Sequence, residues 1–142
     1  MKHIFVIRHA QKNLLTGGIT KKGEEECAVL RKLLPEIAIA ISSPKKRCIE
    51  TAKLLVNHDP KIEQNADIEY DTGTELAQLI RNTMKKLQDG QSALIITHSP
   101  CLEPAYALLQ NKIPLQESMH FRSLEGFIVD DKKKVKLFMH ER

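Results

Sequence analysis

The chain has 142 residues, a length that fits one domain whose core needs neither disulfides nor a metal. Its hydrophobic fraction of 42% and charged fraction of 28% exclude disordered, fibrous and membrane-embedded classes. The net charge of +4 is small, and an aromatic fraction of 4% offers few stacking surfaces for nucleic acid. We therefore expect a single domain over residues 1–142 that binds no nucleic acid.

The cysteine usage and the lengths of the apolar runs predict the cellular compartment of the protein. Cys27, Cys48 and Cys101 are an odd number, and no two have the spacing of a metal knuckle or a redox pair. This usage is typical of reduced thiols, and each cysteine falls in a predicted helix as a small buried side chain. The apolar run after Lys2 is too short for a signal peptide, and no run has membrane length. The sequence thus predicts a cytoplasmic protein with no membrane partner.

Short apolar runs alternate with amphipathic stretches along most of the chain, a pattern typical of βαβ units and a parallel sheet. Thr20 is expected to cap the first helix, and Pro44 to lie in the first turn of the second. The segment 57–67 is expected to be an irregular connection. Strands are predicted at 3–8, 37–42 and 92–97, and helices at 20–34, 44–57, 74–88 and 101–110.

The last part of the chain has a different pattern. Phe121–Val129 and Val135–His140 flank an Asp-Asp-Lys-Lys-Lys segment, as two strands flank a hairpin turn. The lysine run is expected to be a solvated turn, with an anion-binding patch as the less favoured alternative. The whole pattern predicts an α/β three-layer sandwich, with a mostly parallel central sheet, helices on both faces and a C-terminal antiparallel hairpin.

Three strand ends carry the residues with the clearest chemical meaning. The first strand delivers Arg8 and His9, the second is followed one helical turn later by Arg47, and His98 follows the third. Ligands of open α/β sheets bind outside the carboxyl ends of the strands, so we expect these side chains to converge. Guanidinium groups hold phosphate oxygens, while one imidazole attacks phosphorus and the other stabilises the transferring group. The pattern predicts phosphoryl-transfer chemistry.

Each of these residues alone has an ordinary structural explanation. Arg47 can pair with Glu50, the Ser-Pro pair at 43–44 can start a helix, and a histidine after a strand is commonly a surface residue. Neither capping nor packing requires Arg-His and His at successive strand ends, so their joint occurrence favours a site.

Four segments carry specific motifs in order along the chain. They are Arg8-His9-Ala10, Ile-Thr-Lys-Lys-Gly at 19–23, Ser-Pro-Lys-Lys-Arg-Cys-Ile-Glu-Thr-Ala at 43–52, and His98 after a buried strand. Together they resemble the Arg-His-Gly, Leu-Thr-x-x-Gly and Ser-Pro-x-x-Arg-x-x-x-Thr-Ala motifs and the second histidine of the histidine phosphatase superfamily, also called phosphoglycerate mutase-like. The resemblance implies the phosphoglycerate mutase-like fold. In its compactness the chain is similar to the small phosphohistidine phosphatase branch.

The resemblance also implies a role for each matched residue. His9 would be the nucleophile that is transiently phosphorylated, and water would hydrolyse the phosphohistidine. Arg8, Arg47 and His98 would form the phosphate pocket. No metal and no organic cofactor is implied.

The two residues after His9 depart from the family pattern. Ala10 replaces the usual Gly, and Gln11 stands where many members have Glu or Asp. The loop 11–19 is short and lacks the family's long phosphate motif, so Gln11 or one of the two residues after it is expected to contact substrate by position. Ser99, directly after His98, is also predicted to contact phosphate.

A proton donor for the leaving group is expected among the carboxylates of one segment. Glu-Tyr-Asp-Thr-Gly at 69–73 resembles the family's Glu-x-x-x-Gly segment, which favours Glu69, with Asp71 and Glu75 as alternatives. Acidic residues before a helix also have a structural explanation, because they favour its positive N-terminal end. Without an acid, the better substrate is a phosphoramidate, whose leaving group protonates easily.

The leading functional prediction is a metal-independent phosphatase acting on phosphomonoesters or phosphoramidates. A protein phosphohistidine phosphatase in signalling and a non-catalytic module that binds phosphorylated ligands are the alternatives. The partner is accordingly a phosphorylated small molecule or a phosphoprotein. A mutase is not favoured, because the chain is too short for insertions that enclose a phosphorylated intermediate. A zinc module fails on spacing, since His58, His120 and His140 form no short pairs with the cysteines.

Overall fold

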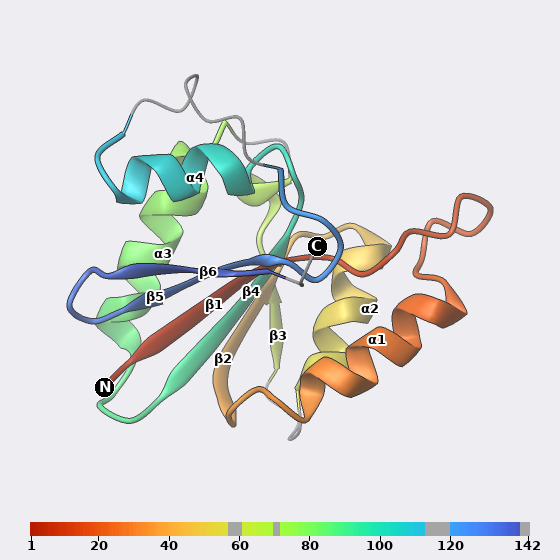
Figure 1. Cartoon of the computed structure of the whole chain (residues 1–142), viewed down its shortest axis with the longest axis horizontal. Coiled ribbons are helices and arrows are strands. Elements are labelled where there is room, and N and C mark those ends of the chain that lie inside the picture. Colours follow the sequence, from red (N-terminus) through yellow and green to blue (C-terminus); the bar gives the residue numbers. More distant parts are fainter. Residues whose placement is uncertain (57–60, 70–71, 113–119, 140–142) are drawn as a thin grey trace.

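The computed structural model describes residues 1–56, 61–69, 72–112 and 120–139. It contains a six-stranded sheet of order β3-β2-β4-β1-β5-β6 with helices packed on its faces (Figure 1). The elements are β1 (His3–Arg8), α1 (Lys21–Arg31), β2 (Ile37–Ser42), α2 (Lys46–Leu55), β3 (Ile62–Gln64), the short 3-10 helix η1 (Ala66–Ile68), α3 (Thr74–Lys86), β4 (Ser92–Thr97), α4 (Leu102–Leu109), β5 (Gly126–Asp130) and β6 (Val135–Phe138).

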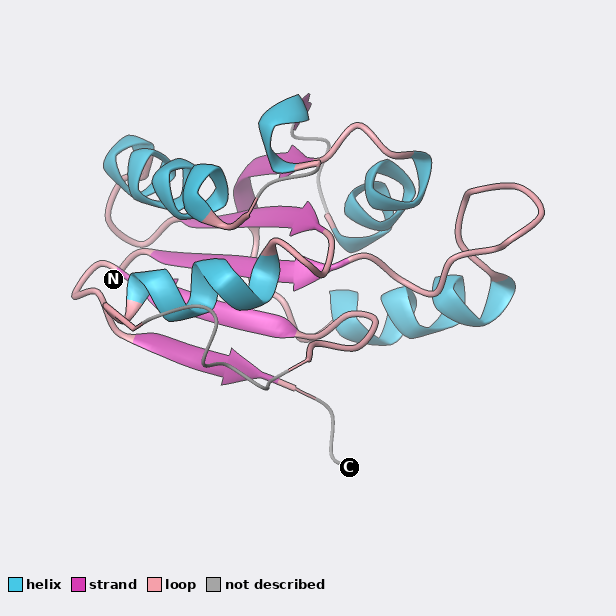
Figure 2. Ribbon diagram, turned by 90° about the horizontal axis from the view of Figure 1, so that it is seen from above, coloured by secondary structure: helices cyan, strands magenta, loops and turns pink. Residues whose placement is uncertain are grey.

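The central strands run parallel and end at the same edge of the sheet. β4 pairs in parallel with β1 and β2, and β2 pairs in parallel with β3, while β5 runs antiparallel to β1 and β6. Every residue of β4 is buried, as expected for a strand covered on both faces. In Figure 2 the arrowheads of β2, β4 and β1 point to the side from which the loop after β1 projects. The predicted α/β sandwich with a C-terminal hairpin is confirmed.

Two cores lie on opposite faces of the sheet because successive strand side chains point to opposite sides. Ile4 and Val6 of β1 pack with α3 and α4, whereas Ile7 packs with α1 and α2. All three cysteines are buried and free, as predicted. In the described part of the chain, no helix is both long enough and apolar enough to span a membrane.

The helices are shorter than predicted, for local reasons. Thr20 lies outside α1 as its N-cap and accepts a hydrogen bond from the Gly23 amide at 3.0 Å, which confirms the predicted cap. The expected position of Pro44 is wrong: α2 begins at Lys46, with Lys45 as its N-cap. Pro44 therefore belongs to the turn that leaves β2 rather than to the helix.

The hairpin begins later than the apolar pattern indicated. The expected strand from Phe121 is wrong up to residue 125, because a turn precedes β5: Leu124 has φ +61° and the Arg122 amide donates to Glu125 Oε1 at 2.7 Å. β6 ends at Phe138, and His140 lies outside the described residues. The turn at 130–134 forms as predicted.

The segment predicted to be irregular contains two short elements. Residues 57–60 lie outside the described part, but β3 extends the sheet by pairing Ile62 with Ala40. η1 follows, and the Thr97 hydroxyl donates to the carbonyl of buried Ile68 at 2.7 Å. This contact fixes the residue after η1, Glu69, close to the end of β4. Elements of three residues show no periodicity, so the pattern missed them.

Candidate active site

His9 and His98 meet at the ends of two neighbouring strands. β1 and β4 are parallel, with Arg8 opposite Thr97, so the residues that follow lie side by side. The His9 amide donates to the Thr97 carbonyl at 3.1 Å. The imidazole centroids are 5.5 Å apart, with 65° between the ring planes, and both histidines are buried. The structure thus brings together the two histidines that the strand pattern placed at one edge.

The hydrogen bonds of His9 determine which nitrogen can attack. Nδ1 lies 2.7 Å from the Ala10 carbonyl oxygen, which only accepts, so Nδ1 carries the proton. The lone pair of the neutral ring is then on Nε2, which accepts a hydrogen bond from Arg47 Nε at 3.3 Å. The free electron pair of His9 therefore faces the Arg47 guanidinium group.

Burial keeps the His9 ring neutral. Removal from water is the largest effect and lowers the pKa of His9 from 6.5 to about 4, against the hydrogen bond to Ala10, which raises it. The positive charges of Arg8 and Arg47 and the neighbouring His98 lower this pKa further. At neutral pH the ring is uncharged, so Nε2 can act as a nucleophile.

Arg47 joins the two histidines. It lies in the first turn of α2, and its Nη2 is 3.4 Å from His98 Nδ1 while its Nε reaches His9. Thr51, one turn later, donates its hydroxyl hydrogen to the Arg47 carbonyl at 2.7 Å and accepts from the Ala10 amide at 3.0 Å. The helix that carries the guanidinium is therefore attached to the residue after His9.

Ser43 and Cys48 surround the other side of His98. Because a guanidinium only donates, His98 Nδ1 accepts from Arg47, and Nε2 donates to Ser43 Oγ at 2.8 Å. A hydroxyl can also donate, so Ser43 can serve the other tautomer, in which Nδ1–H faces outward. Burial, followed by the charge of Arg47, lowers the pKa of His98 to about 4, and burial raises the pKa of Cys48 to about 12. The Cys48 thiol, 3.6 Å from Nε2, is thus an uncharged packing group.

Arg8 approaches the site from the opposite face. Its Nη1 donates to the Phe121 carbonyl at 2.8 Å and lies 3.3 Å from His120 Nε2. The buried Nε–H of Arg8 has no acceptor among the described residues. A buried donor without a partner costs free energy, and an anion bound beside the histidines would supply the missing acceptor.

Glu69 and Lys45 form an ion pair beside His98. Lys45 Nζ lies 2.9 Å from Glu69 Oε1, and the Glu69 side chain retains 17% exposure. The charges of both residues act on His98, Glu69 raising its pKa and Lys45 lowering it. Glu69 therefore reaches the histidine cluster, as the sequence predicted, but with a lysine partner that the sequence did not indicate.

The two alternative carboxylates, Asp71 and Glu75, were predicted from the same motif. Asp71 lies outside the described residues. Glu75 is exposed in the first turn of α3, where a negative charge favours the helix N-terminus. Gly73 of the same motif has a structural reason: its φ is +101°, and a Cβ there would lie 2.6 Å from the Pro104 side chain. The helix contact between α3 and α4 accounts for this glycine.

Two residues predicted to contact substrate or phosphate, Gln11 and Ser99, form hydrogen bonds with other side chains in the structure. Gln11 Oε1 accepts from the Thr20 hydroxyl at 3.0 Å, and the Ser99 hydroxyl donates to Glu103 Oε2 at 2.6 Å. Their contacts with substrate remain predictions. Ala10 is fully buried and packs in the core on the face of α1 and α2.

Sequence reasoning missed several members of the site. Ser43 and Lys45 belong to the matched Ser-Pro block, but the motif alone does not show how close their side chains lie to His98. His120, expected only as a surface or strand residue, is 64% exposed and lies 3.3 Å from Glu103, whose Oε2 also accepts from the Phe121 amide. No pattern in the sequence indicated that His120 lies beside Arg8 or that Glu103 contacts His120.

The described residues contain no group of three or more His, Cys, Asp or Glu side chains arranged to hold a metal ion. The functional groups of the site are instead two neutral imidazoles and two guanidinium groups. Such a set can bind a tetrahedral oxyanion and attack it with nitrogen.

The fold agrees with that of solved structures that include phosphatases and a mutase. No protein-family model matches the chain, and no curated protein matches it in sequence. Phosphoserine phosphatase from Entamoeba histolytica in complex with 3-phosphoglyceric acid is similar over 100% of this chain and 98% of its own, with a TM-score of 0.79 and 16% identity. The protein histidine phosphatase SixA complexed with tungstate is similar over 95% and 93%, with a TM-score of 0.69 and 19% identity. Phosphoglycerate mutase from Plasmodium falciparum is similar over 99% and 94%, with a TM-score of 0.66 and 20% identity. The predicted phosphoglycerate mutase-like fold is confirmed.

Proposed function

We propose that the protein is a metal-independent phosphatase that hydrolyses phosphomonoesters or phosphoramidates through a phosphohistidine on His9. The observation that carries this proposal is the neutral His9 ring, whose Nε2 lone pair faces Arg47 at 3.3 Å. The unpartnered Nε–H of Arg8 supports it, because the bound phosphoryl group would supply the missing acceptor. The similar solved structures include phosphatases named for phosphoserine and for protein histidine, which also supports it.

In the first step, His9 Nε2 attacks phosphorus. The Nε2–P bond forms as the bond from phosphorus to the leaving oxygen or nitrogen breaks, and the leaving group takes the electron pair. Its proton comes from Glu69 when that carboxyl group is protonated, and otherwise from solvent. The ring becomes positively charged, and the Ala10 carbonyl, 2.7 Å from Nδ1, stabilises the Nδ1–H of that ring. Arg8 and Arg47 balance the negative charge on the phosphoryl oxygens, and His98 donates a hydrogen bond to one of them.

In the second step, water attacks phosphorus on the face that the leaving group vacated. The Nε2–P bond breaks and its electron pair returns to His9. The water proton leaves with phosphate or to solvent, and the neutral ring with hydrogen on Nδ1 is restored. The low pKa of His9 favours this product, because the released ring does not retain a second proton at neutral pH.

The Lys45–Glu69 ion pair bears on the substrate class. An ammonium group 2.9 Å away favours the carboxylate anion, and Glu69 must take up a proton before it can act as an acid. Substrates whose leaving group protonates easily need this acid least. We therefore favour phosphoramidates such as phosphohistidine on a protein over alkyl phosphate esters.

The test is phosphate release from nitrophenyl phosphate and from a phosphohistidine peptide in excess chelator. We expect turnover by the wild type and its loss in His9→Ala. The matched control is His3→Ala, at the other end of β1, which should retain turnover. Acid-labile phosphate bound to the wild type, and absent from His9→Ala, would identify the intermediate.

Turnover that persists in His9→Ala would contradict the nucleophile assignment. Turnover that requires an added divalent metal would contradict the metal-independent mechanism. Binding of vanadate without turnover of either substrate would instead identify a module that holds phosphorylated ligands.

A further inference from the structure

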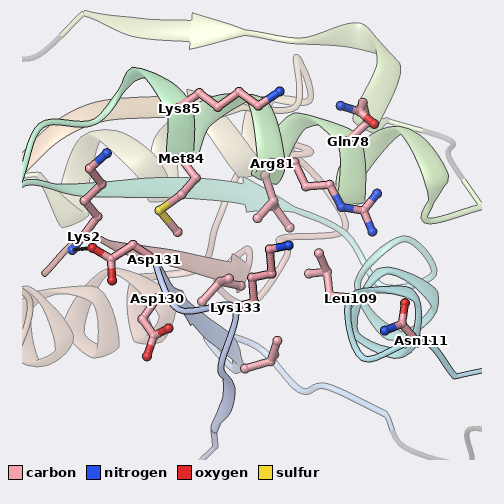
Figure 3. Close-up of a pocket in the computed structure, with 13 residues that line it drawn as sticks. Lys2, Gln78, Arg81, Met84, Lys85, Leu109, Asn111, Asp130, Asp131 and Lys133 are labelled. Atoms are coloured by element: carbon pink, nitrogen blue, oxygen red, sulfur yellow. Dashed lines mark hydrogen bonds between the residues drawn. The ribbon is translucent and has the colours of Figure 1, made fainter.

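A second pocket lies at the end of the sheet opposite His9. It has a volume of about 540 Å³ and lies between α3, the end of α4 and the β5–β6 hairpin (Figure 3). Lys2, which precedes β1, lines it, whereas His9 follows β1. Six strand residues separate these positions, or roughly 20 Å. The volume is in the range of pockets that hold small organic molecules.

The floor of this pocket is apolar. Met84 of α3, Leu109 of α4 and the strand residues Val129 and Val135 line it, and Val129 is only 5% exposed. These side chains come from both helices and from the hairpin, so the floor is continuous with the core on this face. An apolar part of a ligand would bury area against them.

Four positively charged side chains surround the floor: Lys2, Arg81, Lys85 and Lys133. None of them is within 4.0 Å of a carboxylate in the part of the chain that the structure describes. In Figure 3 the Arg81 guanidinium and the Lys133 ammonium point toward the same part of the pocket. Two like charges above an apolar surface repel each other, and a bound anion would relieve this repulsion.

The two carboxylates of the pocket have structural partners. Asp130 Oδ1 accepts from the amides of Lys132 and Lys134, at 2.8 and 3.1 Å. Asp131 Oδ2 accepts from the Lys2 amide at 3.1 Å. The Asp130 contacts hold the turn in which Lys133 has φ +63°, and so fix the backbone that carries the Lys133 side chain. With four cations and two anions, the lining has a net charge of +2.

We propose that this pocket binds a small organic phosphate, with its phosphate between Arg81 and Lys133 and its apolar body on Met84 and Leu109. A phosphomonoester carries nearly two negative charges at neutral pH, which matches the net charge of the lining. Arg81 can hold two phosphate oxygens in a planar fork. No histidine or cysteine is among the described residues that line the pocket, so this is a binding site and not a second catalytic centre.

The test uses benzylphosphonate, a phosphonate dianion that carries an apolar ring. Its ring is joined to phosphorus through carbon, so a phosphatase has no ester or phosphoramidate bond to hydrolyse. Calorimetric titration measures its affinity in the wild type and in the double variant Arg81→Gln, Lys133→Gln. We expect affinity at this site to fall about tenfold or more, because a forked charged contact is lost. The matched control, Lys86→Gln with Lys134→Gln, removes two charges from the same helix and turn outside the pocket, and should retain affinity.

Two further titrations separate this site from the one at His9. In Arg47→Ala, which disrupts the catalytic cluster, benzylphosphonate binding at the second pocket should persist. Methylphosphonate, which lacks the ring, should bind several-fold more weakly than benzylphosphonate, because less apolar area is buried.

Three results would overturn the proposal: equal affinity in the Arg81–Lys133 double variant and the wild type, equal loss in that variant and its control, or loss of all binding in Arg47→Ala alone. Thermal unfolding of each variant checks that it is folded. Nitrophenyl phosphate turnover should be unchanged in the Arg81–Lys133 variant, so failure here is independent of the proposed catalytic function.

Discussion

The two ends of the sheet both gather positive charge, but they do so in different surroundings. At the carboxyl end of β1, Arg47 lies against two buried histidines whose pKa values are lowered to about 4. At the other end, the exposed side chains Arg81 and Lys133 surround an apolar floor without any histidine among the described lining residues. Positive charge suffices to hold an anion, whereas attack on phosphorus needs a neutral nitrogen, and burial produces that nitrogen only at the His9 end.

The largest expected effect is a loss of affinity for vanadate, a compact oxyanion, after substitution at the His9 end of the sheet but not at the other end. Arg47→Ala should weaken vanadate binding by about 2–4 kcal/mol, because a charged contact at a buried site is lost. Arg81→Gln, on the exposed side, should leave tight vanadate binding at His9 unchanged. The vanadate affinity of Arg81→Gln is measured by inhibition of nitrophenyl phosphate turnover. The vanadate affinity of Arg47→Ala is measured by direct titration. Equal losses in both variants would show that the comparison between the ends is wrong.

The next effect concerns stability as a function of pH. His9 has a folded pKa of about 4 against an ordinary 6.5, so the unfolded chain binds more protons between these values. The free energy of unfolding should therefore fall as pH falls from 6.5 to about 4, by up to about 3 kcal/mol from His9 alone. His98 adds a contribution of the same sign.

Urea unfolding between those pH values, for the wild type and His9→Asn, measures this contribution. The variant should show a flatter dependence on pH. His3→Asn is the control and should keep the wild-type slope. Parallel curves for the wild type and His9→Asn would mean that His9 is not buried as a neutral ring.

A smaller and more selective effect is expected from Glu69→Gln. If Glu69 is the proton donor, phenyl phosphate turnover should fall about 10–100-fold while nitrophenyl phosphate turnover changes little, because the nitrophenolate needs no proton. Glu75→Gln, in the exposed first turn of α3, is the matched control. Phosphoramidate turnover that is unaffected by Glu69→Gln would support the preference for easily protonated leaving groups. Equal losses on both esters would exclude Glu69 as the acid.

The sequence predicted much of the catalytic end because strand order and register convert linear motifs into neighbours. His9 and His98 lie 89 positions apart, yet each follows a buried apolar run, and the parallel pairing of Arg8 with Thr97 brings them together. The second pocket has no such origin. Arg81 is one of several exposed charges on α3, and only the folded structure brings it to the same pocket as the hairpin.

The same contrast explains what the sequence patterns did not reveal near the site. Gln11 was predicted to contact substrate from its place beside His9, whereas the hydrogen bond that its side-chain oxygen accepts from the Thr20 hydroxyl was not predicted. The early start predicted for β5 failed because an apolar run does not reveal the left-handed conformation of Leu124. Side-chain hydrogen bonds and turn geometry are set by tertiary contacts that periodicity does not encode.

The smallest expected effect tests a residue that only the structure identified. Ser43 Oγ lies 2.8 Å from His98 Nε2, so Ser43→Ala should leave a buried ring nitrogen without its partner and lower turnover about tenfold. Ser43 acts through His98 and is a positioning residue, so its loss should also shift the pH profile of turnover. The matched control is Ser42→Ala, a neighbouring buried serine whose hydroxyl donates to the Ser43 carbonyl and not to the ring. If both variants lose similar stability but only Ser43→Ala loses turnover, a single hydrogen bond orients His98. Equal turnover in both variants would show that packing around Cys48 is sufficient to orient His98.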